Sequence, residues 1–80
     1  MTQNDSEILP QDPPFSGLSF ADFKFADSVR WTLNGILHEG WVVKINRKSI
    51  TVEIEEANST GFWTTQFYIP PSQLFKGHLS

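Results

Sequence analysis

The sequence predicts an all-β fold, a small barrel of four or five antiparallel strands, from its alternating hydrophobicity, its turn residues and its many aromatic rings. The strongest signal is a pair of alternating apolar and polar stretches that flank the turn Asn46-Arg47-Lys48. Because successive side chains of a strand point to opposite faces, each stretch is expected to place three apolar residues on one face. These residues are Trp41, Val43 and Ile45 before the turn, and Ile50, Val52 and Ile54 after it.

The beginning of the chain differs in composition from the rest. Residues 1–17 contain Pro10, Pro13, Pro14, several small polar residues and few apolar ones, so burial would gain too little to offset the entropy lost on ordering. We expect residues 1–17 to form a flexible acidic tail and residues 18–80 to form one barrel domain. Folding of about sixty residues buries only about 60% of the surface of the unfolded chain. Seven Phe, three Trp and one Tyr are therefore expected to build much of the core.

A short aromatic segment precedes the first strand. Residues 18–25 contain Leu18, Phe20, Phe23 and Phe25, and Ser19 stands where the N-cap of a helical turn would be. We expect one short turn whose rings plug an open end of the barrel. The alternative is an exposed aromatic segment that docks on a partner.

The first strand is expected at residues 28–33. Its apolar residues Val29, Trp31 and Leu33 alternate with polar ones and are expected to face the core. The following pair Asn34-Gly35 readily accepts positive φ, which predicts a tight turn.

The second and third strands are expected at residues 41–45 and 49–55. Gly40 lies at the foot of the second strand, where a residue without Cβ lets the chain bend sharply or approach another strand. Trp41 has the parity of the other apolar residues in its stretch, so it is expected in the core together with Trp31.

The polar residues 55–61 are expected to form a turn before a fourth strand at residues 62–69. Pro70-Pro71 ends this strand because proline cannot donate to a ladder, and residues 72–75 are expected to form a short 3₁₀ turn that places Leu74 or Phe75 on the core. The strands then describe a bent meander whose closure removes exposed edges.

Composition argues against several classes of function. The chain has no Cys, and His38 and His78 lack the spacing of metal ligands, so neither a zinc site nor any other cofactor is expected. No stretch approaches the roughly 20 apolar residues needed to span a bilayer, and the N-terminus lacks a basic, apolar signal sequence. A cytoplasmic location is the default expectation.

Catalysis is not expected either. His38 and Glu39 are adjacent, so in an extended segment they point to opposite faces. Glu53 and Glu55 share a face, but such a pair is usually a solvated outer surface. Ser72 has no base near it in the sequence. We expect a non-enzymatic protein.

Two stretches carry a family resemblance. FADSVRWTLNG and EGWVVKINRKSITVEIEE together resemble the small SH3-like and KOW-like barrels, and FYIPPSQLF is similar to the end of barrels appended to SprT-like proteins. The resemblance implies an SH3-like barrel that binds nucleic acid or protein. The H-E-x-x-H helix of SprT-like enzymes is absent from the sequence, so their metalloprotease activity does not carry over.

The predicted binding residues combine bases with outward rings. With Trp63, Thr65, Phe67 and Ile69 facing inward, Phe62 and Tyr68 face outward. The candidate site, for RNA, DNA or a partner protein, comprises Arg30, Lys44, Arg47, Lys48, Phe62 and Tyr68. The protein alternative is an aromatic groove or a barrel that packs on a second barrel through Phe62.

The charge distribution bears on this choice. The net charge of -3 is the sum of -4 over residues 1–28 and +1 over residues 29–80. The barrel is therefore nearly neutral, and its bases act only as a local patch, which Glu53, Glu55 and Glu56 on the same hairpin oppose.

Overall fold

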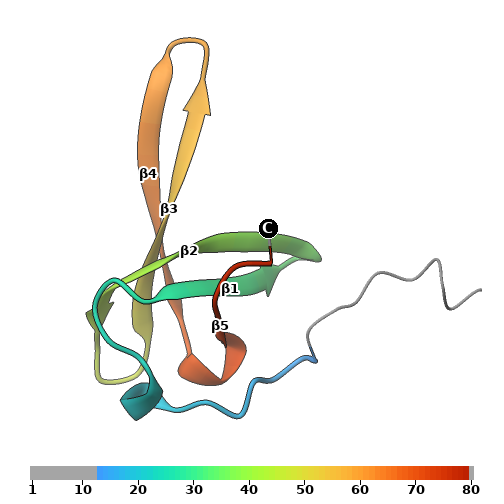
Figure 1. Cartoon of the computed structure of the whole chain (residues 1–80), viewed down its shortest axis with the longest axis vertical. Coiled ribbons are helices and arrows are strands. Elements are labelled where there is room, and N and C mark those ends of the chain that lie inside the picture. The colour runs from blue at the N-terminus through green and yellow to red at the C-terminus, as the bar shows by residue number, and fades with distance from the viewer. Residues whose placement is uncertain (1–12, 80) are drawn as a thin grey trace, which may run out of the picture.

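The computed structural model describes residues 13–79, which form one antiparallel sheet with the strand order β4-β3-β2-β1-β5 (Figure 1). The elements are η2 (Phe20–Asp22), β1 (Ser28–Leu33), β2 (Ile36–Ile45), β3 (Ile50–Asn58), β4 (Gly61–Ile69), η3 (Pro71–Gln73) and β5 (Phe75–Lys76). The expected all-β fold of four or five antiparallel strands is confirmed, with a meander from β1 to β4 and a 3₁₀ turn that returns the chain to β1. The expected closure without exposed edges is wrong: within residues 13–79, β4 pairs only with β3 and β5 only with β1.

The first hairpin follows the expectation from sequence in its strand bounds and its turn, but Leu33, which was expected to face the core, lies at the turn and is exposed. β1 has the predicted bounds, and Leu33 pairs with Ile36 around the turn. Asn34 and Gly35 both have positive φ, 52° and 79°. This is the backbone of a tight hairpin turn whose twist matches that of the flanking strands.

β2 is one continuous strand that begins well before the predicted start at residue 41. Gly40 lies inside it and not at its foot, and an added Cβ there would lie 2.0 Å from the Glu53 carbonyl oxygen. The expected close approach of another strand is therefore confirmed, and it is the reason for a residue without a side chain at this position.

The predicted inward face of β2 is wrong. Val42 is fully buried, whereas Trp41 and Val43 are only half-buried and Ile45 is exposed. A register shift between Val42 and Lys44 places Val42 opposite Val52 and Ile45 opposite Ile50. The extra residue of this β-bulge interrupts the alternation of side chains between the two faces. Trp41 therefore does not lie on the same face as Ile45, although an uninterrupted strand would place it there.

β3 and β4 form a longer hairpin than expected, because β3 continues through the acidic residues to Asn58 and only Ser59 and Thr60 turn. The far end of this hairpin projects from the body of the sheet as an arm, here defined as residues 55–64 (Figure 1). The predicted turn at residues 55–61 is wrong: cross-strand pairing overrides the weak strand propensity of its polar residues.

The core lies between the curved sheet and the two 3₁₀ turns. Ile50, Val52 and Ile54 are buried as expected, and so are Trp31 and Leu74, the latter delivered by η3. Phe23 is buried and Phe20 packs against the cluster, whereas Phe25 is exposed. The complete buried cluster is Phe23, Val29, Trp31, Val42, Ile50, Val52, Ile54, Ile69 and Leu74.

Contacts with the domain begin before the expected boundary at residue 18. The Ser16 amide donates to the Ser72 carbonyl at 2.7 Å, and its hydroxyl donates to the Pro71 carbonyl at 3.2 Å. The rest of the predicted flexible tail, residues 1–12, lies outside the described residues. Over residues 13–79 there is no helix of the length and hydrophobicity that crossing a membrane requires.

Candidate nucleic-acid interface

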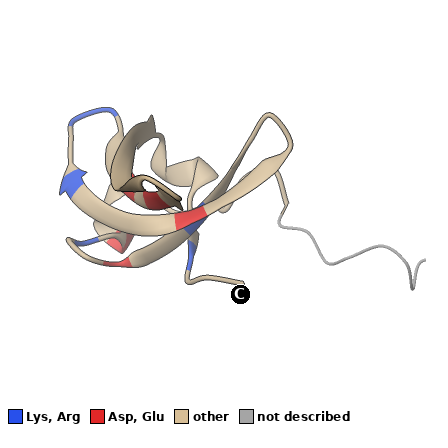
Figure 2. Cartoon of the chain, turned by 90° about the horizontal axis from the view of Figure 1, so that it is seen from above, with Lys and Arg blue, Asp and Glu red and all other residues tan. Residues whose placement is uncertain are grey.

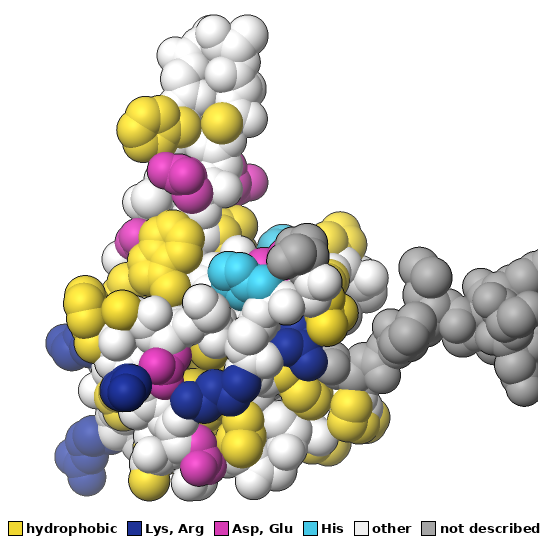
Figure 3. Space-filling model, viewed as in Figure 1, with side chains coloured by type: hydrophobic (Ala, Val, Ile, Leu, Met, Phe, Trp, Pro, Cys, Tyr) yellow, Lys and Arg dark blue, Asp and Glu magenta, His cyan; other side chains and the backbone are white. Residues whose placement is uncertain are grey.

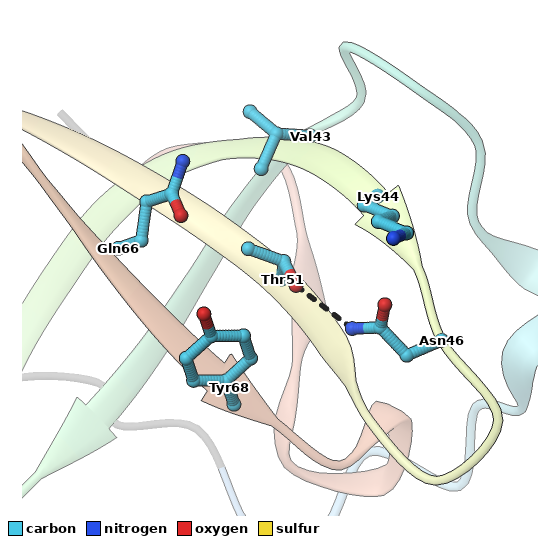
Figure 4. A pocket seen from close by; sticks show the side chains of 6 residues that line it. All are labelled: Val43, Lys44, Asn46, Thr51, Gln66 and Tyr68. Carbon is cyan, nitrogen blue, oxygen red and sulfur yellow. Dashed lines mark hydrogen bonds between the residues drawn. The ribbon is translucent and has the colours of Figure 1, made fainter.

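The outer face of β2, β3 and β4 carries an open groove of about 380 Å³ near the turn between β2 and β3 (Figure 4). The strand register explains its composition. Lys44 pairs with Thr51, and Thr51 pairs with Tyr68, so these three side chains form a row across three strands. The groove is lined by Val43, Lys44, Asn46, Thr51, Gln66 and Tyr68.

Tyr68 supplies the aromatic surface of the groove. Its side chain is 67% exposed and stands beside polar groups (Figure 4). An exposed ring on a rigid strand is suited to stacking, because little conformational entropy is lost when a planar ligand lies on it.

Hydrogen bonds hold the polar side chains of the groove in place. The Asn46 amide donates from Nδ2 to Thr51 Oγ1 at 2.8 Å (Figure 4), and its backbone amide donates to the Ser49 carbonyl at 2.9 Å. Gln66 Nε2 donates to Glu53 Oε1 at 3.1 Å. Thr51 is buried. The side-chain oxygen of Asn46, Oδ1, is therefore the acceptor of this pair that a ligand in the groove can reach.

The positive charge lies at one end of the groove. Lys44, Arg47 and Lys48 are all exposed, and Figure 2 shows Lys and Arg at the end of β2 and in the turn that follows it. Within residues 13–79, the ammonium group of Lys44 forms no ion pair. These cations are available to an anionic ligand.

The carboxylates lie on the other side of the groove. Glu53 is one step further along β3 on the same face and pairs with Gln66, and Glu55 follows on the arm. Charge on the outer face therefore changes from positive at the turn to negative toward the arm. A phosphate chain is attracted to one end only.

The structure brings four of the six predicted binding residues to one end of the sheet: Lys44, Arg47, Lys48 and Tyr68. Phe62 shares their outer face but lies six positions from Tyr68 along β4, which is about 20 Å at the rise of a strand. Arg30 lies on β1, where its Nη1 donates to the carbonyl oxygens of Lys76 and Gly77 and its guanidinium stacks over the Phe75 ring at 5.6 Å.

Four residues of the groove were not expected from the sequence. Val43 was expected in the core, and Asn46, Thr51 and Gln66 have the pattern of ordinary turn and outward strand residues. Only the pairing of three strands places these residues together. The register of that pairing could have identified them, but the sequence does not reveal the bulge at Val43 on which the register depends.

Within the described part of the chain, no group of three or more His, Cys, Asp or Glu residues could hold a metal ion. His38 instead packs on the inner face, with its ring centroid 5.9 Å from that of Trp31 and 5.3 Å from that of Phe67. Its contacts are those of an aromatic core residue.

Comparison with known proteins adds no relative. A scan against protein-family models, a search of curated proteins and a search of solved structures all found no match.

Proposed function

We propose that the protein is a non-enzymatic module that binds single-stranded nucleic acid at the groove of β2, β3 and β4. The observation that carries the proposal is the exposed Tyr68 ring in one row with Lys44, next to the basic turn. Single strands bind to this combination, because bases stack on aromatic rings and phosphates pair with cations. The resemblance to KOW-like barrels and the expected cytoplasmic location fit this function.

Each part of the groove has a role in this proposal. Tyr68 stacks on a base, which contributes about 1 to 3 kcal/mol per base. Lys44, Arg47 and Lys48 neutralise phosphates, and the Asn46 carbonyl oxygen accepts from the edge of the stacked base. The Glu53 carboxylate repels the phosphate backbone of the nucleic acid and keeps that backbone at the basic end of the groove.

The main test is the anisotropy of a labelled single-stranded oligonucleotide, titrated with protein at several salt concentrations. With three phosphate contacts, the logarithm of the association constant should fall with the logarithm of salt concentration with a slope of about -2. Tyr68→Ala should weaken binding by about 10-fold or more, and Lys44→Glu should weaken binding and flatten the slope.

Two control variants make the same kinds of substitution at exposed residues outside the groove. Phe25→Ala removes another ring, which is 73% exposed, and Lys24→Glu reverses another exposed charge. Both should leave the affinity unchanged. Equal losses for Phe25→Ala and Tyr68→Ala, or binding that is insensitive to salt, would contradict the proposed site.

A protein partner is the second candidate, because Phe62 exposes 72% of its side chain on the same strand face. A partner that docks there should be retained at high salt and lost on Phe62→Ala. Nucleic-acid binding should not change with that substitution, since Phe62 lies outside the groove.

A further inference from the structure

β4 is an edge strand with none of the features that usually protect an edge. It is nine residues long, GFWTTQFYI, and contains no charged residue and no proline. Natural sheets shield such edges with charges, prolines, bulges or short strands, because an unpaired edge of this composition pairs with other strands. Within residues 13–79, no strand pairs with the outer side of β4.

The pairing with β3 fixes which backbone groups of β4 are free. A two-residue turn requires Asn58 and Gly61 to be a hydrogen-bonded pair, and such pairs alternate along an antiparallel ladder. The amides and carbonyls of Phe62, Thr64, Gln66 and Tyr68 therefore point away from β3. No other backbone hydrogen bond among the described residues uses them.

We infer that β4 pairs antiparallel with β4 of a second copy of this chain, with the two-fold axis at Thr65. A two-fold axis perpendicular to the sheet keeps each residue on its own face, so opposed residues must have the same parity. The register centred on Thr65 is the one of this kind that uses the whole strand. It turns the free groups of Phe62 toward those of Tyr68 of the second copy, and the free groups of Thr64 toward those of Gln66.

Side-chain chemistry favours a second copy as the occupant. The register opposes aromatic with aromatic residues, Phe62 with Tyr68 and Trp63 with Phe67, and Thr with Gln or Thr. Aromatic pairs directly across two strands are favourable. Because β4 has no charge, no like charges meet across the axis. The strand is complementary to itself.

The arm gives an independent reason. Trp63 faces inward by its register but lies beyond the core, 45% exposed, with its Nε1 donating to Glu56 Oε2 at 3.2 Å. Figure 3 shows hydrophobic side chains on the arm, outside the body of the domain. In the pair, Trp63 lies opposite Phe67 of the second copy, whose ring already contacts Trp31 with centroids 5.6 Å apart. The second copy thereby buries the Trp63 side chain, which the core of its own chain does not cover.

The area is sufficient for a reversible dimer. Phe62, Trp63 and Tyr68 expose 72%, 45% and 67% of their side chains. At about 200 Å² per ring, covering them in two copies removes at most about 700 Å². This is nearly half of the roughly 1,600 Å² of a standard interface, which is in the range of weak, reversible pairs. Because Tyr68 is among the covered rings, the second copy and a stacked base compete for it.

The test compares two double variants that differ at one position. In T64K/Q66K, the lysines introduced at 64 and 66 oppose one another across the axis, so the dimer should dissociate. In T64K/Q66E, each new lysine opposes a new glutamate of the second copy, so the dimer should persist. Glu55 and Glu53 on β3 pair with positions 64 and 66, so T64K/Q66K gains attractions within its own chain and should remain folded.

The readout is the molar mass by light scattering and sedimentation, from micromolar to millimolar concentration. The wild-type protein and T64K/Q66E should approach the mass of two chains, and T64K/Q66K should keep the mass of one chain, with the near-ultraviolet spectrum of each confirming folding. A wild-type mass of one chain throughout would overturn the inference, as would a dimer that tolerates T64K/Q66K. The protein could also have the mass of one chain while the amides of Phe62, Thr64, Gln66 and Tyr68 exchange slowly. A segment of the same chain would then pair with the edge of β4, and the inference would be wrong.

Discussion

Gly40 shows how one residue can determine the path of two strands. Because Gly40 has no side chain, the carbonyl oxygen of Glu53 can occupy the space that a Cβ atom would take. Gly40→Ala should lower the free energy of unfolding by about 3 kcal/mol or more, because the clash is with backbone that cannot move without breaking the ladder. Urea unfolding followed by tryptophan fluorescence measures this.

Gly35 provides the control for that substitution. It has positive φ, but a Cβ there would meet nothing within 4 Å. Gly35→Asn should cost only about 1 kcal/mol, since asparagine accepts the left-handed conformation. A cost for Gly40→Ala no larger than this would show that β2 and β3 do not approach so closely.

Asp27 makes the stability of the domain depend on pH. Its Oδ2 accepts from Lys76 Nζ and from the Lys24 amide, each at 2.9 Å. The hydrogen bond from Lys76 is the main reason that the pKa of Asp27 lies below its ordinary value of 3.8. A lowered pKa means that the carboxylate form stabilises the folded state above that value, and that this stabilisation is lost as pH falls through the folded pKa.

The expected effect is small, because the Lys76 amine is half-exposed and solvent screens such pairs to about 1 kcal/mol or less. Asp27→Asn should lower the free energy of unfolding at pH 7 by this amount, and the difference should shrink as pH falls below 3.8 and through the folded pKa of Asp27. Urea titrations across this range test the pair. A difference between the two proteins that is the same at every pH would contradict the role of the carboxylate.

At the scale of elements, η3 connects the edge strand β4 to β5 and closes one side of the core with Leu74, which is fully buried. Leu74→Ala should cost about 2 to 5 kcal/mol by leaving a cavity, a large part of the stability of so small a domain. Thermal unfolding measures this loss. Leu79→Ala removes an exposed leucine near the same end of the chain and should shift the midpoint little. Similar shifts for both would show that η3 does not seal the core.

The strands show which patterns in the sequence could be read and which could not. β1, the Asn34-Gly35 turn and the buried face of β3 were predictable, since alternation and turn chemistry are local. The inward face of β2 was not, because Val43 adds a residue that the partner strand does not match. The length of the arm was not predictable either, since pairing with β4 draws Glu55 and Glu56 into a strand that their own propensities disfavour.

At the scale of the whole molecule, the sheet sorts charge by position, a property that net charge conceals. Lys44, Arg47 and Lys48 were predicted as one patch because they are close in sequence, and they lie together at one end. The inclusion of Tyr68 depended on the parity of β4, which the register supports. Arg30 and Phe62 were grouped with them because they too were expected to face outward, and the fold places them away from the groove.

The most direct test of the groove is a spectrum of the isotope-labelled protein during titration with a short single-stranded oligonucleotide. The resonances of Lys44, Asn46, Thr51 and Tyr68 should shift and saturate together, while those of Phe25 and Arg30 should stay in place. Shifts confined to β1 and β5, or an unchanged spectrum at an excess of oligonucleotide, would contradict binding at the groove.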